Sequence, residues 1–414
     1  MTKLLKQGFN WIDSRFPLSS FWRKNFAEYY APKNLNFWYY FGAFSLLVLA
    51  NQIITGIWMS MFYIPTGNEA FSSVENTMRY VNLGWLIRYM HSTGASAFFV
   101  VIYLHIYRCI MYGSYRKPRE LLWLIGVVLY ILLMAEAYTG YVLPWGQMSF
   151  WASRVISAII MAIPFIGGPL AVWFIGDYSV SSVTLHRFFS YHATGIPLII
   201  LLVVLFHLMA LRKVGSNNPD GIEIKDKLDA SGKPLDGIPF HPYFVVKDLV
   251  GIVVFIFICA LIIFYFPTFG GLFIEPENYV PSNPLKTPLH IAPAWYLAPF
   301  YAILRAIPNK LFGIIALASS IAVLFVLPWL DKSPVKSIRY KGTLSKIALT
   351  LFVISFIGLG YFGTQPVDDT GVWISRIFTV IYFLFFLLMP FYTRREKTKL
   401  PPERVTQKKL FNWD

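Results

Sequence analysis

Eight long apolar segments constrain this chain more than any other feature of its sequence. Each is close to or above the length of about 20 residues that a helix needs to cross the hydrocarbon core of a bilayer. A backbone in lipid must satisfy its own hydrogen bonds, so the predicted fold class is an all-α polytopic membrane protein. The expected transmembrane helices cover residues 37–62, 85–112, 121–143, 188–211, 249–267, 311–330, 347–362 and 373–392.

The composition excludes several other classes. Only 14% of the residues are charged and 56% are hydrophobic, whereas a soluble domain has about 25% charged residues. The two cysteines, Cys109 and Cys259, lie in apolar segments and belong to no haem-attachment or metal-binding motif. We interpret them as small buried hydrophobic residues. A soluble protein, a disordered chain and a disulfide scaffold are therefore disfavoured.

The net charge of +15 reports topology rather than nucleic-acid binding. Of the 36 basic residues, 27 lie in the N-terminal segment, in the loops after the second, fourth and sixth spans, and in the C-terminal tail. With eight spans, all these segments lie on one side, which the positive-inside rule makes cytoplasmic. We therefore predict both termini in the cytoplasm, and basic loops that contact anionic membrane lipids.

Three further segments shape the expected organisation. The N-terminus resembles a short amphipathic helix on a membrane surface and has no signal-peptide core. Residues 147–176 are apolar but contain Pro164 and a glycine pair, so we expect a helical hairpin lying on the membrane. A polar loop over residues 215–247 divides the chain into two four-helix halves. The predicted domains are residues 1–225 and residues 226–414.

Four of the seven histidines lie inside two spans. His91 and His105 are 14 residues apart in the second span, and His192 and His207 are 15 apart in the fourth. Fourteen helical residues rise roughly 21 Å and return to within about 40° of the same face. A spacing of 15 overshoots by about 60°, and Pro197 could kink or re-register that helix. We expect His91 to face His192 on the outer side and His105 to face His207 on the inner side.

Paired imidazoles inside a membrane indicate a function. A single histidine on an apolar face is usually a satisfied core residue, but four in two spans are costly. Two imidazoles across a gap suit a bis-histidine haem. Zinc usually takes more ligands, and a proton relay would need carboxylates between the histidines.

The neighbouring spans carry glycines and the histidine-bearing segments carry arginines that fit the same interpretation. Glycine lets a flat macrocycle approach a helix closely, although small residues also serve ordinary helix packing. Arginines could pair with haem propionates, or could extend to the membrane surface. The glycines, 14 apart in each span, are Gly42 and Gly56, and Gly126 and Gly140; the arginines are Arg88, Arg108 and Arg187.

Several motifs together resemble cytochrome b of the respiratory cytochrome bc complex (complex III) of bacteria. They are WLIRYMHSTGAS, GYVLPWGQMSFW, GSNNPDG, IPFHPYF and PAWYLAPFYAILRAIPNKL, spread over nearly the whole chain. The resemblance implies that the first four helices form a bundle holding two non-covalent b-type haems. It implies a quinol-oxidising pocket outside, a quinone-reducing pocket inside, and proton translocation coupled to quinol–cytochrome c oxidoreduction. The quinone would be ubiquinone or menaquinone.

The resemblance also implies partners and a location. The partners are a Rieske iron–sulfur protein, a membrane-anchored c-type cytochrome and a second copy of the complex. The location is the bacterial inner membrane. One feature, the spacing of 15 in the fourth span, is more similar to the photosynthetic branch of the family.

The outer pocket departs from the family pattern PEWY, because Ala294 replaces the glutamate that usually accepts a proton. We hypothesise that Glu136, an intramembrane carboxylate, takes over this role. The alternative is a protonated glutamate bonded to a neighbouring helix. Ala152 stands where many relatives have glycine and narrows the pocket. The other residues that match family pocket positions are Tyr141, Pro293, Trp295, Tyr296 and Tyr301.

The inner pocket also departs from the family in one position. Ser216, Lys247 and Asp248 match the family pattern, and Asp248 could either supply protons or stabilise the start of its helix. Arg212 stands where the respiratory family commonly has a quinone-contacting histidine. An arginine can donate a hydrogen bond but cannot shuttle a proton at neutral pH.

Three alternatives remain open at this point. One is the haem subunit of a different membrane quinone oxidoreductase, which the PAWY and GYVLPWGQMSFW motifs disfavour. Another is a transporter that uses the histidines as a proton pathway and binds no haem. The third is a structural membrane anchor with neither haem nor quinone chemistry.

Overall fold

The computed structural model describes residues 3–23 and 28–406 of the chain. Within them, eight helical segments are long and apolar enough to cross a membrane, so the predicted fold class and number of spans are confirmed. Their bounds are Phe37–Ser60, Gly84–Tyr112, Glu120–Val142, Ser182–Val214, Phe240–Tyr265, Lys310–Leu330, Thr343–Thr364 and Asp369–Leu387.

Four of these spans, the fourth, fifth, seventh and eighth, differ from the predicted bounds by four residues or more at one end or both, and the seventh begins at Thr343 instead of residue 347. The fourth begins at Ser182 because the helix α9 (Ser182–Ser190), capped by the Ser181 side chain, leads through a π-helical turn, η3 (Tyr191–Gly195), into α10 (Ile196–Val214). The fifth also begins earlier, with the π-helical turn η5 (Phe240–Phe244) before α11 (Val245–Tyr265). The eighth ends at Leu387, and the short helix α16 (Met389–Arg395) follows it.

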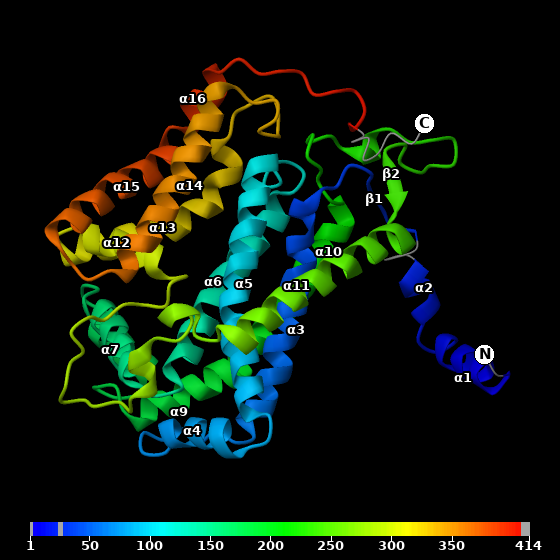
Figure 1. The fold of residues 1–414 in the computed structure, drawn as a ribbon. Coiled ribbons are helices and arrows are strands. Elements are labelled where there is room, and N and C mark those ends of the chain that lie inside the picture. The colour runs from blue at the N-terminus through cyan, green and yellow to red at the C-terminus, as the bar shows by residue number, and fades with distance from the viewer. Residues whose placement is uncertain (1–2, 24–27, 407–414) are drawn as a thin grey trace.

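The helices form two adjoining groups (Figure 1). In the first group α3 (Tyr40–Ser60) packs along α5 (Gly84–Tyr112), and α6 (Glu120–Val142) packs along α10. In the second group α12 (Ala298–Ala306) packs against α13 (Lys310–Leu330), α14 (Thr343–Thr364) and α15 (Asp369–Leu387). Because α11 packs on α3 and α5, the predicted division after residue 225 stays a prediction.

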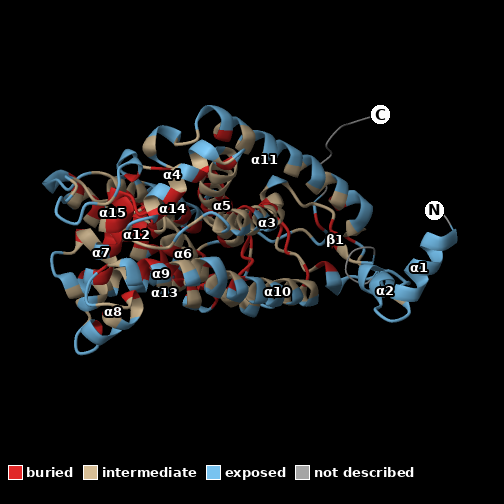
Figure 2. Cartoon of the chain, turned by 90° about the horizontal axis from the view of Figure 1, so that it is seen from below, coloured by how far each residue is buried: buried red, intermediate tan, exposed pale blue. Residues whose placement is uncertain are grey.

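A shared hydrophobic core joins the two groups. It includes Phe99 and Tyr130 of the first group and Phe300 and Tyr382 of the second. Figure 2 shows buried residues concentrated around α12, whereas α10 and α11 are mostly exposed. Their exposed side chains are largely apolar, as expected for helices that face lipid or another transmembrane subunit.

The segments predicted to share one side do meet on one face. Strand β1 (Tyr30–Pro32) pairs antiparallel with β2 (Gly237–Pro239), which joins the N-terminal segment to the loop after the fourth span. Asp236 in that loop lies 2.9 Å from Lys33 Nζ and 2.9 Å from Arg404 Nε of the C-terminal tail. The short turn η4 (Ile224–Asp226) belongs to the same loop. This arrangement agrees with an even number of spans.

The opposite face carries the predicted hairpin. Helices α7 (Gln147–Met161) and α8 (Gly167–Ile175) pack on each other. Three more elements lie at the same end of the molecule: the helix α4 (Ala70–Tyr80) and the turns η6 (Phe269–Gly271) and η7 (Pro276–Tyr279). The helices α1 (Lys3–Asp13) and α2 (Leu18–Trp22) extend away from the body, and α1 is exposed. The turn η2 (Phe37–Tyr39) begins the first span. Contact of α1 with a membrane stays a prediction.

Candidate functional site

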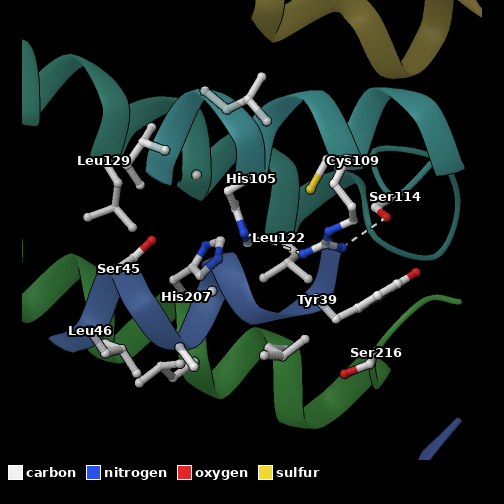
Figure 3. A pocket seen from close by; sticks show the side chains of 18 of the residues that line it. Tyr39, Ser45, Leu46, His105, Cys109, Ser114, Leu122, Leu129, His207 and Ser216 are labelled. Atoms are coloured by element: carbon white, nitrogen blue, oxygen red, sulfur yellow. Dashed lines mark hydrogen bonds between the residues drawn. The ribbon is translucent and has the colours of Figure 1, made fainter. Parts of the chain in front are cut away.

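The four intramembrane histidines lie in two facing pairs. The rings of His91 on α5 and His192 in η3 have centroids 6.0 Å apart and are nearly perpendicular, at 79°. His105 on α5 and His207 on α10 point toward each other and line a common cavity (Figure 3). The π-helical turn accommodates one extra residue. His192 and His207, 15 residues apart, can therefore lie on one face of the fourth span, as His91 and His105, 14 residues apart, do on α5.

Each of the four predicted glycines lies against one of these histidines. A Cβ atom added at three of them would lie within 3.5 Å of an imidazole Cε1, and at Gly140 it would overlap with the His192 ring. A Cβ at Gly42 would be in ordinary contact with its ring and one at Gly56 or Gly126 in tight contact, so only Gly140 strictly requires glycine for its histidine to keep this position. The pairs are Gly42 with His105, Gly56 with His91, Gly126 with His207 and Gly140 with His192.

The outer pair has hydrogen-bonding partners at Nδ1. Thr55 Oγ1 lies 2.9 Å from His91 Nδ1. His192 Nδ1 lies 3.0 Å from the backbone carbonyl oxygen of Glu136 and 3.0 Å from the Glu136 carboxylate. Such contacts fix the orientation of a ring and leave Nε2 for another ligand. The Glu136 carboxylate therefore lies against a histidine of the outer pair.

The residues fit a haem iron better than a metal with more ligands. Across the described ranges, no group of three or more His, Cys, Asp or Glu residues could hold a metal ion. Each histidine pair supplies two imidazoles, which is the ligand set of a bis-histidine haem. The buried His207 Nδ1 has no hydrogen-bond partner among the described residues, so this imidazole is not committed to another group and remains available as a ligand.

The three predicted arginines lie in different surroundings. Arg108 lines the inner cavity, with Nη2 3.4 Å from His105 Nδ1 and Nη1 3.3 Å from Ser114 Oγ. Arg187 donates to the backbone carbonyl of Trp173 and so ties α9 to α8. Arg88 Nη1 lies 3.0 Å from the sulfur of Met78. Pairing of these arginines with propionates stays a prediction.

The inner cavity brings the predicted haem and quinone residues together. Its volume is about 350 Å³, and Figure 3 shows His105, His207 and Ser216 along it. Ser216 Oγ lies 3.1 Å from Tyr29 Oη, and the guanidinium of Arg212 lies 4.2 Å from the centroid of the Tyr29 ring. The predicted residues that line this cavity are Gly42, His105, Arg108, Gly126, His207, Arg212, Ser216, Lys247 and Asp248.

A second, smaller cavity of about 50 Å³ lies at the opposite end, beside the PAWY segment. Trp295 Nε1 donates to Ser96 Oγ over 3.1 Å, and the Tyr296 ring stacks on Phe99 with centroids 4.0 Å apart. These contacts fix the segment to α5 between its two histidines. The predicted residues that line the cavity are Tyr141, Ala152, Pro293, Ala294, Tyr296 and Tyr301. Glu136 is not among its lining residues.

The GQMS segment holds the loop that leads to PAWY. Gln147 Oε1 accepts a hydrogen bond from the Asn283 amide (2.7 Å), and Asn278 Oδ1 accepts one from the Ser149 amide (2.9 Å). Asn278 Nδ2 also donates to Glu275 Oε2 over 3.1 Å. The sequence reasoning did not identify Glu275, because an acid in an irregular loop carries no periodic signal.

Fold and site together define a multi-pass membrane protein of the haem-binding type, with one histidine pair near each end of a helix bundle. The family model described as "Cytochrome b/b6/petB" matches residues 26–215, and the model described as "Cytochrome b(C-terminal)/b6/petD" matches residues 281–383. Cytochrome b of Allochromatium vinosum is 54% identical over 97% of this chain and 98% of its own length. The chain belongs to the cytochrome b family.

Two further relatives support the family assignment. A protein named cytochrome b/c1 from Bradyrhizobium diazoefficiens is 44% identical over 96% of this chain and 56% of its own length. A solved structure titled "Hyperthermophilic respiratory Complex III" superimposes with a TM-score of 0.86 and 36% identity, covering 94% of this chain and 99% of that one. Membership of this family implies haem b binding and a role in electron transfer.

Proposed function

We propose that this chain is the subunit of a bc-type complex that oxidises quinol at an outer pocket and reduces quinone at an inner pocket. His91 and His192 would ligate an outer b-type haem, and His105 and His207 an inner one. The observation that carries the proposal is the facing of four histidines in two pairs, each histidine against a glycine of a neighbouring helix. When bound, the two haems would supply one-electron carriers between the pockets.

At the outer pocket, the chain's own residues would bind and orient quinol. Pro293 and Tyr296 line the outer cavity and would form part of its wall. Trp295 does not line the cavity and would instead hold the segment in place through Ser96, as Tyr296 does through Phe99. Tyr141 and Tyr301 would contact the quinol ring or its hydroxyls. The released protons would leave on the outer side.

Glu136 remains our candidate for a proton acceptor near the outer pocket. Its carboxylate lies against His192, which makes orientation of that ring an alternative role. The two roles differ in what Glu136→Gln would change. Loss of a proton acceptor slows quinol oxidation, whereas loss of an orienting partner shifts the midpoint potential of the outer haem. Unchanged turnover across pH would refute the first role.

At the inner pocket, Ser216 and Arg212 would donate hydrogen bonds to quinone oxygens, and Asp248 would feed protons from the cytoplasmic side. Their shared lining of the cavity with His105 and His207 supports this placement. Lys247 lies beside Asp248 and would hold negative charge near the entrance. Because Arg212 does not titrate near neutral pH, proton delivery would rest on Asp248 and water.

We also propose the assembly and the location. The partners would be a Rieske iron–sulfur protein, a membrane-anchored c-type cytochrome, membrane lipids and a second copy of the complex. The similarity to a cytochrome b/c1 protein and to a respiratory Complex III supports a multisubunit assembly with a c-type cytochrome. The protein would lie in a bacterial inner membrane with both termini in the cytoplasm. Ubiquinone and menaquinone both remain candidate substrates.

A quinol-driven reaction in membranes tests this function. Membranes with the assembled complex should reduce cytochrome c when given a soluble quinol analogue, and His192→Leu should abolish the reaction. Ser181→Ala, a change in the helix cap of α9, is the control and should retain turnover. Wild-type membranes that contain the complex but show no quinol-dependent reduction would contradict the proposal.

A further inference from the structure

One acidic side chain beside the outer cavity has no role in the function proposed above. Glu275 lies in the loop between α11 and α12 and is half-buried. None of the ion pairs formed by the described residues involves it. The charged form of a carboxylate is costly to bury without a cation, and such groups are concentrated at functional sites where they take up or release protons.

The surroundings of Glu275 connect it to the outer cavity. The titratable groups that face it are Tyr141 of α6, Tyr296 before α12, and Glu277 of its own loop. Tyr141 and Tyr296 line the cavity together with Ala294, the residue that replaces the usual glutamate. Glu275 itself does not line the cavity but neighbours Tyr141, which does.

The loop that carries Glu275 is held firmly. The buried Asn278 accepts a hydrogen bond from the Ser149 amide at the start of α7 and donates one to Glu275 Oε2. A backbone bridge between Gly146 and Pro281 and the contact of Gln147 with Asn283 hold the same loop against α7. Glu275 is thus positioned by at least one specific hydrogen bond and does not depend on a mobile loop.

We propose that Glu275 accepts one of the two quinol protons in the outer pocket, through Tyr141, while Glu136 remains the candidate for the other. This inference rests on the proposed quinol-oxidising function. The quinol hydroxyl would give its proton to the Tyr141 oxygen while the Tyr141 proton passes to the Glu275 carboxylate. The two quinol electrons would leave to one-electron acceptors of the complex, an iron–sulfur cluster and a haem, and the second quinol proton would pass to Glu136, so that quinone is formed. Glu275 would then release the proton to the outer aqueous phase, which restores the starting state.

The electrostatics of the loop support this role. Burial raises the pKa of Glu275 to about 7, although the hydrogen bond from Asn278 and the neighbouring Tyr141 hydroxyl act in the opposite direction. The Tyr141 hydroxyl is buried and has no hydrogen-bond partner among the described residues, so it is free to exchange a proton with quinol. A base works best when its pKa lies near the working pH, because it can then both take up and release the proton. The unprotonated form accepts the proton, so the rate should rise as the pH increases through about 7.

The test uses the assembled complex in membranes and compares Glu275→Gln with Glu277→Gln. The exposed Glu277, two residues further along the same loop, provides a matched control. Quinol-driven cytochrome c reduction should fall about tenfold or more in Glu275→Gln and lose its rise near neutral pH. Glu277→Gln should keep the wild-type rate and the rise with pH, with a midpoint that moves at most slightly lower, because the Glu277 charge is the smallest of the contributions that raise the pKa of Glu275. An infrared carboxyl band that titrates near pH 7 should disappear in Glu275→Gln and persist in Glu277→Gln.

The outcomes separate this inference from the function on which it rests. Wild-type complex without any quinol-dependent turnover would overturn both. Wild-type turnover with an unchanged pH profile and carboxyl band in Glu275→Gln would overturn only the role of Glu275. If the Glu275→Gln complex loses its haem, the Glu275→Asp complex is compared instead. A shifted midpoint in the pH dependence of its turnover supports the role of Glu275, and an unchanged midpoint refutes it.

Discussion

At the scale of single residues, the site is built from histidine–glycine contacts between neighbouring helices. The sequence predicts these residues well, because histidines and glycines inside apolar spans stand out and share a period of 14. Glu275 could not be predicted in this way. Its burial depends on contacts of its loop with Ser149 and Gln147, which lie more than a hundred residues away in the chain.

Gly140 provides the sharpest test of these contacts. An alanine Cβ at this position would overlap with the His192 ring, so we expect Gly140→Ala to displace the ring and lose the outer haem. The purified complex should then hold about half of the wild-type b haem, with the inner haem retained. The control is Gly168→Ala, because a Cβ at Gly168 has no atom within 4 Å. A full haem content in Gly140→Ala would contradict the close contact.

At the scale of elements, irregular turns and loop contacts adjust the regular helices. The predicted spans were confirmed in number, but the fourth and fifth begin earlier than apolarity alone suggests. Each begins with a π-helical turn or a capped amphipathic turn, whose polar residues lower the local hydropathy. The spacing of 15 residues between its histidines indicated that the fourth span departs from a regular α-helix. The sequence did not indicate that a π-helical turn is the cause.

Removal of one residue from the π turn tests this explanation. Deletion of Ala193 should convert η3 to a regular α-helical turn and reduce the histidine spacing to 14, the spacing already used in α5. We therefore expect the deletion variant to keep both b haems, as measured by its reduced-minus-oxidised spectrum. Loss of the outer haem in a variant that still assembles would show that the turn has another role.

A contact between two loops attaches the C-terminal tail to the body. Burial alone would raise the pKa of Asp236, but hydrogen bonds from Arg404, Lys33 and the Val405 amide outweigh it and lower the pKa to about 2. Because the pKa of Asp236 in the folded protein is below its usual value of 3.8, this stabilisation is complete above about pH 4 and is lost as the pH falls through about 2.

Replacement of Asp236 should release the tail at neutral pH. In Asp236→Asn the Val405 amide loses a charged acceptor, so its hydrogen exchange should become at least about tenfold faster, since hydrogen bonds to charged groups contribute about 1.5–3 kcal/mol. The control Glu403→Gln changes an exposed acid beside the same segment. Equal protection of Val405 in Asp236→Asn and wild type would contradict the attachment.

At the scale of the whole molecule, the charge distribution, the eight spans and the β1–β2 pairing agree on one topology. The basic loops, the N-terminal segment and the tail meet on one face, as the sequence predicted. The inner and outer cavities lie toward opposite ends of the bundle, so quinol oxidation and quinone reduction would exchange protons with different compartments. This separation is what would couple electron transfer to proton translocation.

Labelling of introduced cysteines tests the sidedness. Ser231 lies exposed in the loop after the fourth span, and Tyr178 is 85% exposed at the opposite end. A membrane-impermeant thiol reagent should label Tyr178→Cys in intact spheroplasts and Ser231→Cys only in inverted vesicles. The native Cys109 and Cys259 lie within spans and give the background. The reverse pattern would place the basic face outside.

The haem content of the purified complex tests the central claim most directly. A pyridine haemochrome assay, normalised to this chain, should give two non-covalent b haems for the wild type. His207→Leu should retain only the outer one, and its redox titration should show one midpoint where the wild type shows two. Folded wild-type protein with one b haem or none would contradict the account of the paired histidines and of electron transfer between two pockets.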